Sequence, residues 1–202
     1  MPADAAWSPL GDGSDRILPA DLAGAAHDTL EPGSLDSDEG PDDRRARLGA
    51  GTVAQIPVRY TQSGEQVSPA LSWTNVPART VWLLLHVHDP DVARNKTTDD
   101  QLHWLVWNLP ATATGLPEGV AAGAERPDGS LQISARGPND RGPGAAAAGR
   151  LHHYTFEIYA LDTKVDVATG SDPFETRTVV LKAIQGHVLG KAVYVGLFHR
   201  PQ

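Results

Sequence analysis

The sequence contains no cysteine, which excludes disulfide bonds, thiolate catalysis and zinc sites built on sulfur. It also lacks a long hydrophobic run, because the apolar segment "VWLLL" at 81–85 is far shorter than a membrane span. The first residues, "MPADAAWSPLGDGSD", have neither the basic nor the apolar segment of a secretory signal peptide. We therefore expect a soluble cytoplasmic protein with no integral membrane association.

Basic residues are scarce, and the charge that exists is unevenly spread. Residues 1–50 hold 11 of the 25 acidic and 4 of the 17 basic residues, so this part carries −7 of the net charge of −8. The remainder is almost neutral and has no basic stripe that could neutralise the phosphates of a nucleic acid. We expect no nucleic-acid partner.

The length of 202 residues suits one domain with an extension. Residues 1–50 are rich in Asp, Gly, Pro and Ala and bury too little apolar surface to offset the entropy of ordering them. We predict a mobile acidic extension over 1–50 and a single domain over 51–202. The extension is a tail without chemistry, a lid, or an arm that contacts a protein partner.

From residue 52 onward, short apolar or alternating runs are separated by turn residues, which is typical of an all-β domain with a few short helices. The predicted strands are 52–60, 71–73, 81–88, 103–109, 131–135, 152–161 and 192–198. A helix is predicted over 175–186, where apolar residues share one face and a glycine could end it.

Period-two alternation assigns the two strand histidines to faces of the sheet. It places His152 on the same apolar side as Tyr154. It groups His103 with Leu105 and Trp107. Apolar residues occur on both faces of the strand at 103–109, which predicts a central position in the sheet.

The stretch "HDPDV" raises the first chemical question. Pro90 keeps the residue before it extended, so the carboxylates of Asp89 and Asp91 tend to project the same way, roughly 6–7 Å apart along the chain. Mutual repulsion should raise the pKa of one of them and allow it to donate a hydrogen bond. The same tripeptide also describes a surface turn.

A glycine-rich stretch, "RGPNDRGPGAAAAGR" at 136–150, precedes the strand that begins with His152. Gly142 and Gly144 allow close approach of the backbone to a ligand, and their N–H groups could point at an anion. Any glycine loop has these properties, so the stretch is informative only together with its neighbours.

Five segments, in order, resemble the phosphatidylethanolamine-binding protein family, which includes the Raf kinase inhibitor proteins, plant flowering regulators and many bacterial members. They are "IPVRYTQSGEQVSPALSWTNVP", "HDPDV", "HWLVWNLP", "GPGAAAAGRLHHYTFEIYALD" and "GHVLGKAVYVGLF". The resemblance runs from Ile56 to Leu197 and leaves the first 50 residues outside.

The resemblance implies a large antiparallel sheet with a smaller second sheet, and a pocket at one end that accepts phosphate-like groups such as phospholipid headgroups, without a cofactor. By position in the motifs, the pocket residues are Asp89, Asp91, His103, Gly142, Gly144, His152 and Tyr154. A protonated histidine and a carboxyl with a raised pKa could both donate to an oxyanion. The expected partner is therefore a small anionic molecule.

The sequence departs from the family pattern in three places. His88 stands where the family usually has an aspartate or another polar residue, Asp140 where it has an aromatic residue, and Ala145 and Ala146 where it favours two prolines. A charged Asp140 beside Arg141 would make the pocket mouth polar.

Other readings stay open. Asp89 or Asp91 could act as a base, with His103 or His152 as the acid, in a cofactor-independent isomerase, cyclase or lyase. A second alternative is a kinase or protease inhibitor that uses the acidic extension as its contact arm. A homodimer is also open.

A metal site is a further reading, because His86 and His88 share a strand face and Asp89 or Asp91 could add an oxygen. The alternative is that His86 is a histidine packed in the core and that His88 lies at the rim of the pocket. We expect no metal.

Overall fold

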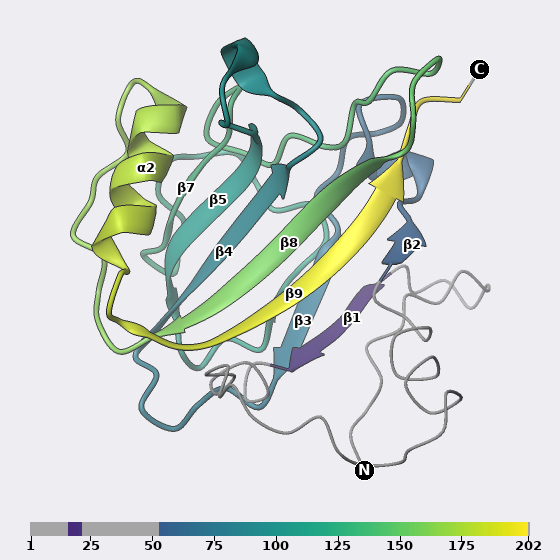
Figure 1. Cartoon of the computed structure of the whole chain (residues 1–202). Coiled ribbons are helices and arrows are strands. Elements are labelled where there is room, and N and C mark those ends of the chain that lie inside the picture. The colour runs from purple at the N-terminus through teal and green to yellow at the C-terminus, as the bar shows by residue number, and fades with distance from the viewer. Residues whose placement is uncertain (1–15, 22–52, 202) are drawn as a thin grey trace, which may run out of the picture.

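The computed structural model describes residues 16–21 and 53–201, and Figure 1 shows a broad twisted sheet as its main element. In spatial order the strands of this six-stranded sheet are β2 (Val53–Gln55), β9 (Val188–Phe198), β8 (His152–Leu161), β4 (Trp82–Asp89), β5 (Gln101–Pro110) and β7 (Leu131–Ile133). All neighbours pair antiparallel except β2, which pairs parallel with β9.

A smaller sheet packs behind it and consists of β1 (Arg16–Asp21), β3 (Ala70–Thr74) and β6 (Gly115–Leu116). The prediction of a large antiparallel sheet with a smaller second sheet is confirmed, with parallel pairing only at β2–β9 and β1–β3 among the described strands. Residues 16–21 of the predicted extension thus form a strand. The rest of that extension lies outside the described residues.

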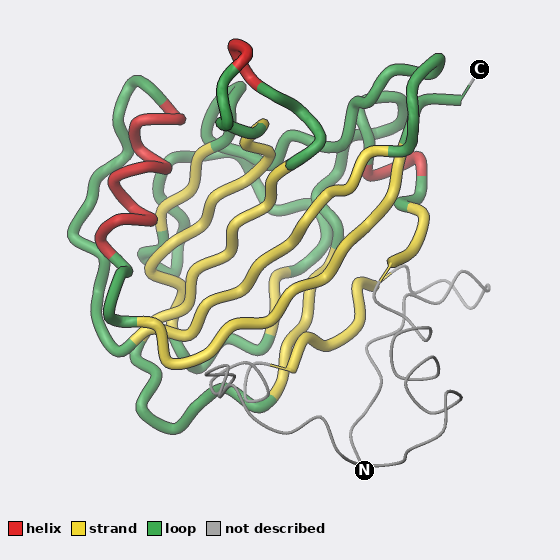
Figure 2. The backbone as a smooth tube through the Cα atoms, in the orientation of Figure 1, coloured by secondary structure: helices red, strands yellow, loops and turns green. Residues whose placement is uncertain are grey.

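The helices are short and lie in the connections, shown in red in Figure 2: η1 (Val58–Tyr60), η2 (Arg94–Lys96) and α2 (Pro173–Ala183). The α2 helix begins two residues before the predicted start because Asp172 caps it, accepting from the backbone N–H of Phe174 and Glu175. No helix in the described part of the chain is long and apolar enough to cross a membrane.

Two hydrophobic clusters lie on opposite faces of the large sheet. One fills the space between the two sheets and contains Trp73, Trp104 and Tyr154. The other packs under α2 and contains Trp107 and Val180. The central strand β5 contributes a tryptophan to each cluster, which confirms that it is buried on both faces.

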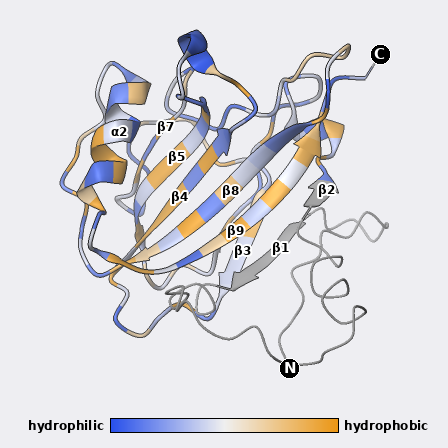
Figure 3. Cartoon of the chain, viewed as in Figure 1, coloured by the Kyte–Doolittle hydropathy of each residue, from blue (hydrophilic) through white to orange (hydrophobic). Residues whose placement is uncertain are grey.

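Alternation along β8 is confirmed by its burial pattern, and Figure 3 shows hydrophobic and hydrophilic residues mixed along β8 and β9. Tyr154, Phe156 and Ile158 are buried, while His153 is exposed. The predicted strand 52–60 is wrong beyond Gln55, because a 3₁₀ turn follows it.

Asn108 joins β5 to the loop that leads from β8 to α2. Its side-chain amide donates to the Val165 carbonyl and accepts from the Val165 N–H, each at 2.9 Å. Its φ of 58° is left-handed, a conformation that Asn tolerates better than most residues. Asn108 therefore both adopts the left-handed backbone conformation and forms two buried hydrogen bonds to Val165.

We expect Asn108→Ala to lower the free energy of unfolding by about 3 kcal/mol, because it leaves both Val165 groups unpaired and strains the bend. The matched control is Asn75→Ala, an exposed residue with a φ of 55°. It should cost about 1 kcal/mol from the backbone strain alone. Equal losses of unfolding free energy for the two variants in urea denaturation would show that the two hydrogen bonds to Val165 contribute nothing.

Candidate functional site

The candidate site lies where β4 ends and the antiparallel neighbours β5 and β8 begin. Asp89 is the last residue of β4 and pairs in register with Gln101, the first residue of β5. His152 is the first residue of β8. The sheet topology therefore brings these polar strand ends together.

His103 reaches this site through a β-bulge in β5. Leu102 is in register with His88 and Trp104 with Val87, so His103 is an extra residue without a partner on β4. A bulge of this kind re-aims side chains. The prediction that groups His103 with Leu105 and Trp107 is therefore wrong.

The His103 ring instead packs edge-on against Tyr154, with ring centroids 5.0 Å apart. Tyr154 belongs to the cluster between the two sheets, whereas Leu105 and Trp107 belong to the cluster under α2. The bulge thus places His103 on the same side of the sheet as Tyr154.

Asp89 organises the polar groups at the strand ends. The residue is only 2% exposed, and its Oδ2 lies 2.8 Å from Nδ1 of His152. Its Oδ1 accepts from the backbone N–H of Asp91 at 3.0 Å. Because His152 uses Nδ1 for this contact, its Nε2 is left for other partners.

Asp91 points to a different partner. Its Oδ2 accepts from the backbone N–H of His153 at 2.6 Å and lies 2.9 Å from Nδ1 of the same residue. Partial burial would raise the pKa of Asp91, but the bonds to His153 outweigh this and lower it. The expected rise of a pKa by repulsion is therefore wrong for Asp91.

The glycine-rich loop packs closely against residues 60–62. A Cβ atom on Gly142 would lie 2.3 Å from the Tyr60 carbonyl oxygen, and one on Gly144 would lie 2.4 Å from Nε2 of Gln62. Gly142 is thus needed for close approach of two backbone segments, whereas the contact at Gly144 is with the end of a flexible side chain.

The N–H groups of this loop have a partner inside the protein. Those of Gly144 and Ala145 donate to the Tyr154 hydroxyl at 3.2 and 3.0 Å. Burial, with a further contribution from the Asp89 carboxylate, raises the pKa of Tyr154 to about 12. Tyr154 therefore holds the loop in place as a neutral phenol.

Together these groups form a cleft of about 260 Å³, the Asp89 cleft. Its lining comprises Gln62, Asp89, Val92, Gln101, His103, Arg141, Gly144, Ala145, Ala146, His152 and Tyr154. Of the predicted residues, Asp89, His103, Gly144, His152 and Tyr154 line it, whereas Asp91 and Gly142 do not.

Sequence reasoning missed Gln62, Gln101 and Arg141 as lining residues. Gln101 could have been found, because it lies two residues before the strand predicted over 103–109. Gln62 and Arg141 stand in loops, where no periodicity indicates the direction of a side chain.

Arg141 and His103 hold each other through two hydrogen bonds. The Arg141 N–H donates to the His103 carbonyl at 3.0 Å, and Nδ1 of His103 lies 2.5 Å from the Arg141 carbonyl oxygen. The Arg141 guanidinium forms no ion pair with any residue in the described ranges 16–21 and 53–201. The cleft therefore has a cationic group that no described carboxylate neutralises.

The imidazole of His103 is uncharged at neutral pH. Burial lowers its pKa to about 4, and the Arg141 carbonyl compensates only in part. The carbonyl requires a proton on Nδ1, so Nε2 of the neutral ring is a hydrogen-bond acceptor. The expected imidazolium donor is thus replaced by an acceptor.

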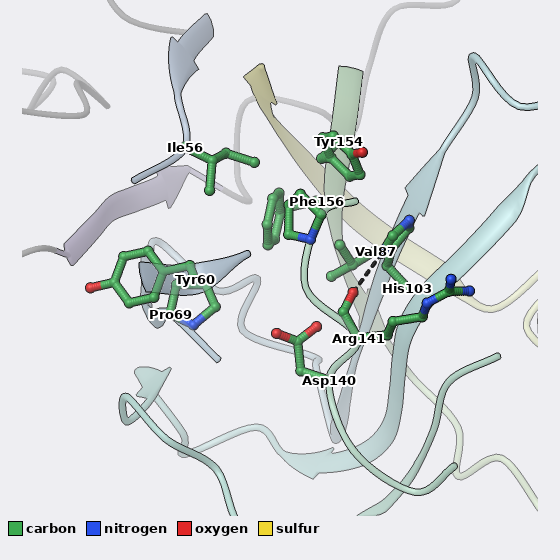
Figure 4. Close-up of a pocket in the computed structure, with 10 residues that line it drawn as sticks. Ile56, Tyr60, Pro69, Val87, His103, Asp140, Arg141, Tyr154 and Phe156 are labelled. Atoms are coloured by element: carbon green, nitrogen blue, oxygen red, sulfur yellow. Dashed lines mark hydrogen bonds between the residues drawn. The ribbon is translucent and has the colours of Figure 1, made fainter. Parts of the chain in front are cut away.

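Beside the cleft lies a small enclosed pocket of about 10 Å³, the Asp140 pocket, drawn in Figure 4. The Asp140 carboxyl group points into it, near Pro69 and Tyr60. Burial raises the pKa of Asp140 to about 8. Asp140 therefore does not form the charged mouth that the sequence suggested.

Metal-ligand atoms come close together at two places in the described part of the chain. One is Asp89, Asp91 and His152, whose ligand atoms lie within 4.8 Å of one another. The other is His86, His88 and Glu157 on the opposite face of the sheet. His88 is thus not a rim residue of the cleft, whereas His86 is buried as expected.

The depressed pKa of His103 predicts an acid-dependent loss of stability. Its ordinary pKa of 6.5 applies when the chain is unfolded, so on acidification the unfolded state takes up the proton first. As pH falls from 6.5 to about 4, the protein should lose up to about 3 kcal/mol from this residue. Urea denaturation at several pH values measures the loss.

In His103→Asn this part of the loss should be absent, because an amide can donate to the Arg141 carbonyl but does not titrate. The control is His187→Asn, which changes a half-exposed histidine paired with Asp162. If the free energy of unfolding depends on pH in the same way in the wild type and in His103→Asn, the lowered pKa of His103 would be contradicted.

Comparison with known proteins identifies the family. The family model described as phosphatidylethanolamine-binding protein matches residues 50–199. A UPF0098 protein from Methanothermobacter thermautotrophicus is 41% identical over 150 residues, which cover 72% of this chain and 91% of that protein.

Solved structures of related proteins support the same family. A phosphatidylethanolamine-binding protein homologue from Chlamydia trachomatis has a TM-score of 0.61 at 28% identity and covers 74% of this chain and 92% of its own. YbcL of Escherichia coli, described as a member of the mammalian family, has a TM-score of 0.59 at 26% identity, with coverages of 73% and 92%. The chain belongs to the phosphatidylethanolamine-binding protein family, as its strand-end motifs and its two-sheet fold indicate.

Proposed function

We propose that the Asp89 cleft binds a small molecule through an anionic group, with a phosphate monoester such as a phospholipid headgroup as the best fit. The observation that carries this proposal is Arg141, a residue of the cleft lining whose guanidinium has no carboxylate partner among the described residues. Guanidinium groups match the oxygens of phosphates and carboxylates.

The other cleft groups add a requirement for a donor on the ligand. The Asp89 carboxylate and Nε2 of the neutral His103 are acceptors. A singly protonated phosphate offers both an anionic oxygen to Arg141 and a P–OH to an acceptor. The ethanolamine ammonium of a headgroup would also suit the carboxylate.

The size of the cleft favours a headgroup over a whole lipid. A volume of about 260 Å³ lies just below the usual range of about 300–1,000 Å³ for small-molecule sites. The names of the family and of its structural relative from Chlamydia trachomatis refer to phosphatidylethanolamine binding, which supports the same ligand class for this chain.

The main test is calorimetric titration with O-phosphoethanolamine and inorganic phosphate. Binding should be stronger at pH 6 than at pH 8, because phosphate is then more often singly protonated. Arg141→Gln should weaken binding by about 10- to 100-fold, as expected for loss of a charge-assisted hydrogen bond. Arg136→Gln, which removes an exposed neighbouring charge, should change it less than about twofold. Equal effects of the two variants would contradict a specific role for Arg141.

One observation favours the enzyme alternative as a second candidate. The Asp140 pocket brings together a carboxyl whose pKa is raised to about 8 and an imidazole whose pKa is lowered to about 4. At neutral pH this pair consists of an acid that holds its proton and a base that is free, which suits general acid–base catalysis. The pocket has room for about one water, so a substrate would have to enter by widening it from the cleft.

This candidate requires a protonated Asp140. Because its pKa is raised on folding, the unfolded state ionises first, and stability should be lost as pH rises from about 4 to 8. Asp140→Asn should remove that loss and be more stable than the wild type by about 5 kcal/mol at pH 8, with little difference at pH 4.

The control for Asp140→Asn is Asp128→Asn, whose carboxylate accepts two hydrogen bonds from Ser130. These bonds lower the pKa of the Asp128 carboxyl despite its partial burial. Asp128→Asn loses the favoured carboxylate, so this variant should be destabilised at pH 8. An Asp140→Asn variant that is no more stable than the wild type at pH 8 would rule out the protonated acid.

The inhibitor alternative and a homodimer have no specific observation in their favour among the described residues.

A further inference from the structure

A second group of polar side chains lies on the face of the large sheet that α2 covers in part, away from the Asp89 cleft. His86 and His88 alternate with Val87 on β4, and Glu157 on β8 is in register with His86. Nδ1 of His86 lies 3.5 Å and Nε2 of His88 lies 3.7 Å from the same oxygen, Oε2 of Glu157. We call these three residues the His86 cluster.

Three of the four imidazole nitrogens of this cluster lack hydrogen bonds to the described residues. Both ring nitrogens of His86 and Nε2 of His88 are buried and have no hydrogen-bond partner among the described residues. The His86 side chain is 6% exposed. A buried nitrogen without a partner costs about 1–3 kcal/mol and calls for an explanation, such as a bound ion.

The remaining nitrogen of His88 is held as it would be in a metal site. Nδ1 of His88 lies 2.5 Å from Oδ2 of Asp100, and the other oxygen of Asp100 pairs with Arg177 of α2. With the proton on Nδ1, Nε2 carries the lone pair, and this atom lies 3.7 Å from Oε2 of Glu157. A carboxylate behind a histidine in this way is the usual second layer around a zinc ligand.

Glu157 is positioned as well, because Tyr159 donates to its Oε2 at 2.6 Å and Lys191 pairs with its Oε1.

A route from solvent also exists. A cavity of about 490 Å³ between the sheet and α2 is lined by His86, Asp99, Asp100, Arg177 and Lys182, among others.

We propose that His86, His88 and Glu157 bind a divalent transition-metal ion, with Zn²⁺ as the best fit and a water in the fourth position. Two imidazoles and one carboxylate form a known zinc ligand set. Metal bonds of about 2.0–2.2 Å in a tetrahedron separate the ligand atoms by about 3.3–3.6 Å. The two distances to Oε2 are close to this range.

One adjustment is needed for binding. The two rings are stacked, with an interplanar angle of 1° and centroids 4.4 Å apart. A metal must lie near the plane of each ring, so the rings have to tilt until both lone pairs converge. This movement gives the proposal a direct spectroscopic signature in the ring resonances of both histidines.

The test is calorimetric titration of the full, chelator-treated chain with ZnCl₂ near pH 7. We expect one Zn²⁺ per chain, and Glu157→Gln should weaken its binding at least tenfold. His152→Gln is the matched control, because it disrupts the other cluster of ligand atoms, Asp89, Asp91 and His152, and should leave binding unchanged within twofold. Circular dichroism in the presence of chelator checks that both variants are folded.

Asp100→Asn tests the positioning residue and should weaken Zn²⁺ binding by about 10- to 100-fold without removing a ligand. Wild-type protein loaded with Co²⁺ should show the intense visible absorption of a tetrahedral site and should shift the ring signals of His86 and His88. This readout does not depend on any variant. Absence of Zn²⁺ binding, or binding that is lost in His152→Gln and kept in Glu157→Gln, would overturn the proposal.

Discussion

One extra residue in β5 determines which groups share the cleft. Without the bulge, His103 would continue the row of Leu105 and Trp107 and would be buried under α2. With it, His103 lies against Tyr154, and its backbone and ring bond to Arg141 in both directions. The same contacts therefore orient the histidine, anchor the glycine-rich loop and bring a guanidinium to the cleft.

The two faces of β4 differ in how their polar groups are satisfied. On the cleft side, Asp89 bonds to His152 and to the backbone of Asp91, so the site is organised before any ligand binds. On the opposite side, His86 has two buried nitrogens without a hydrogen-bond partner in the described chain. Preorganised groups suit a ligand that binds by fitting existing geometry, whereas unpartnered nitrogens suit an ion that completes the geometry. One strand can thus support two sites of different chemistry.

Much of the fold and part of the cleft follow from the sequence. Strand periodicity locates β4, β5 and β8, and the resemblance to the family implies that Asp89, His103 and His152 meet. The periodicity fails at the bulge, because a single extra residue changes the face of His103 and depends on pairing with β4. The burial of Asp140 and the approach of Arg141 depend on how an irregular loop packs against residues 60–62, and alternation carries no information about a loop. Glu157 joins the His86 cluster through the register of two strands 70 residues apart, which a local pattern does not show.

The most direct test of this account is NMR of the histidine side chains with ¹⁵N-labelled protein, because it reports the tautomer and the charge of His103 and its contact with a ligand. The account predicts that His103 is neutral at pH 7 with its proton on Nδ1, that it stays neutral down to about pH 5, and that phosphate shifts the Nε2 resonance. A His103 that titrates near its ordinary pKa of 6.5, or whose Nε2 does not respond to phosphate, would contradict it.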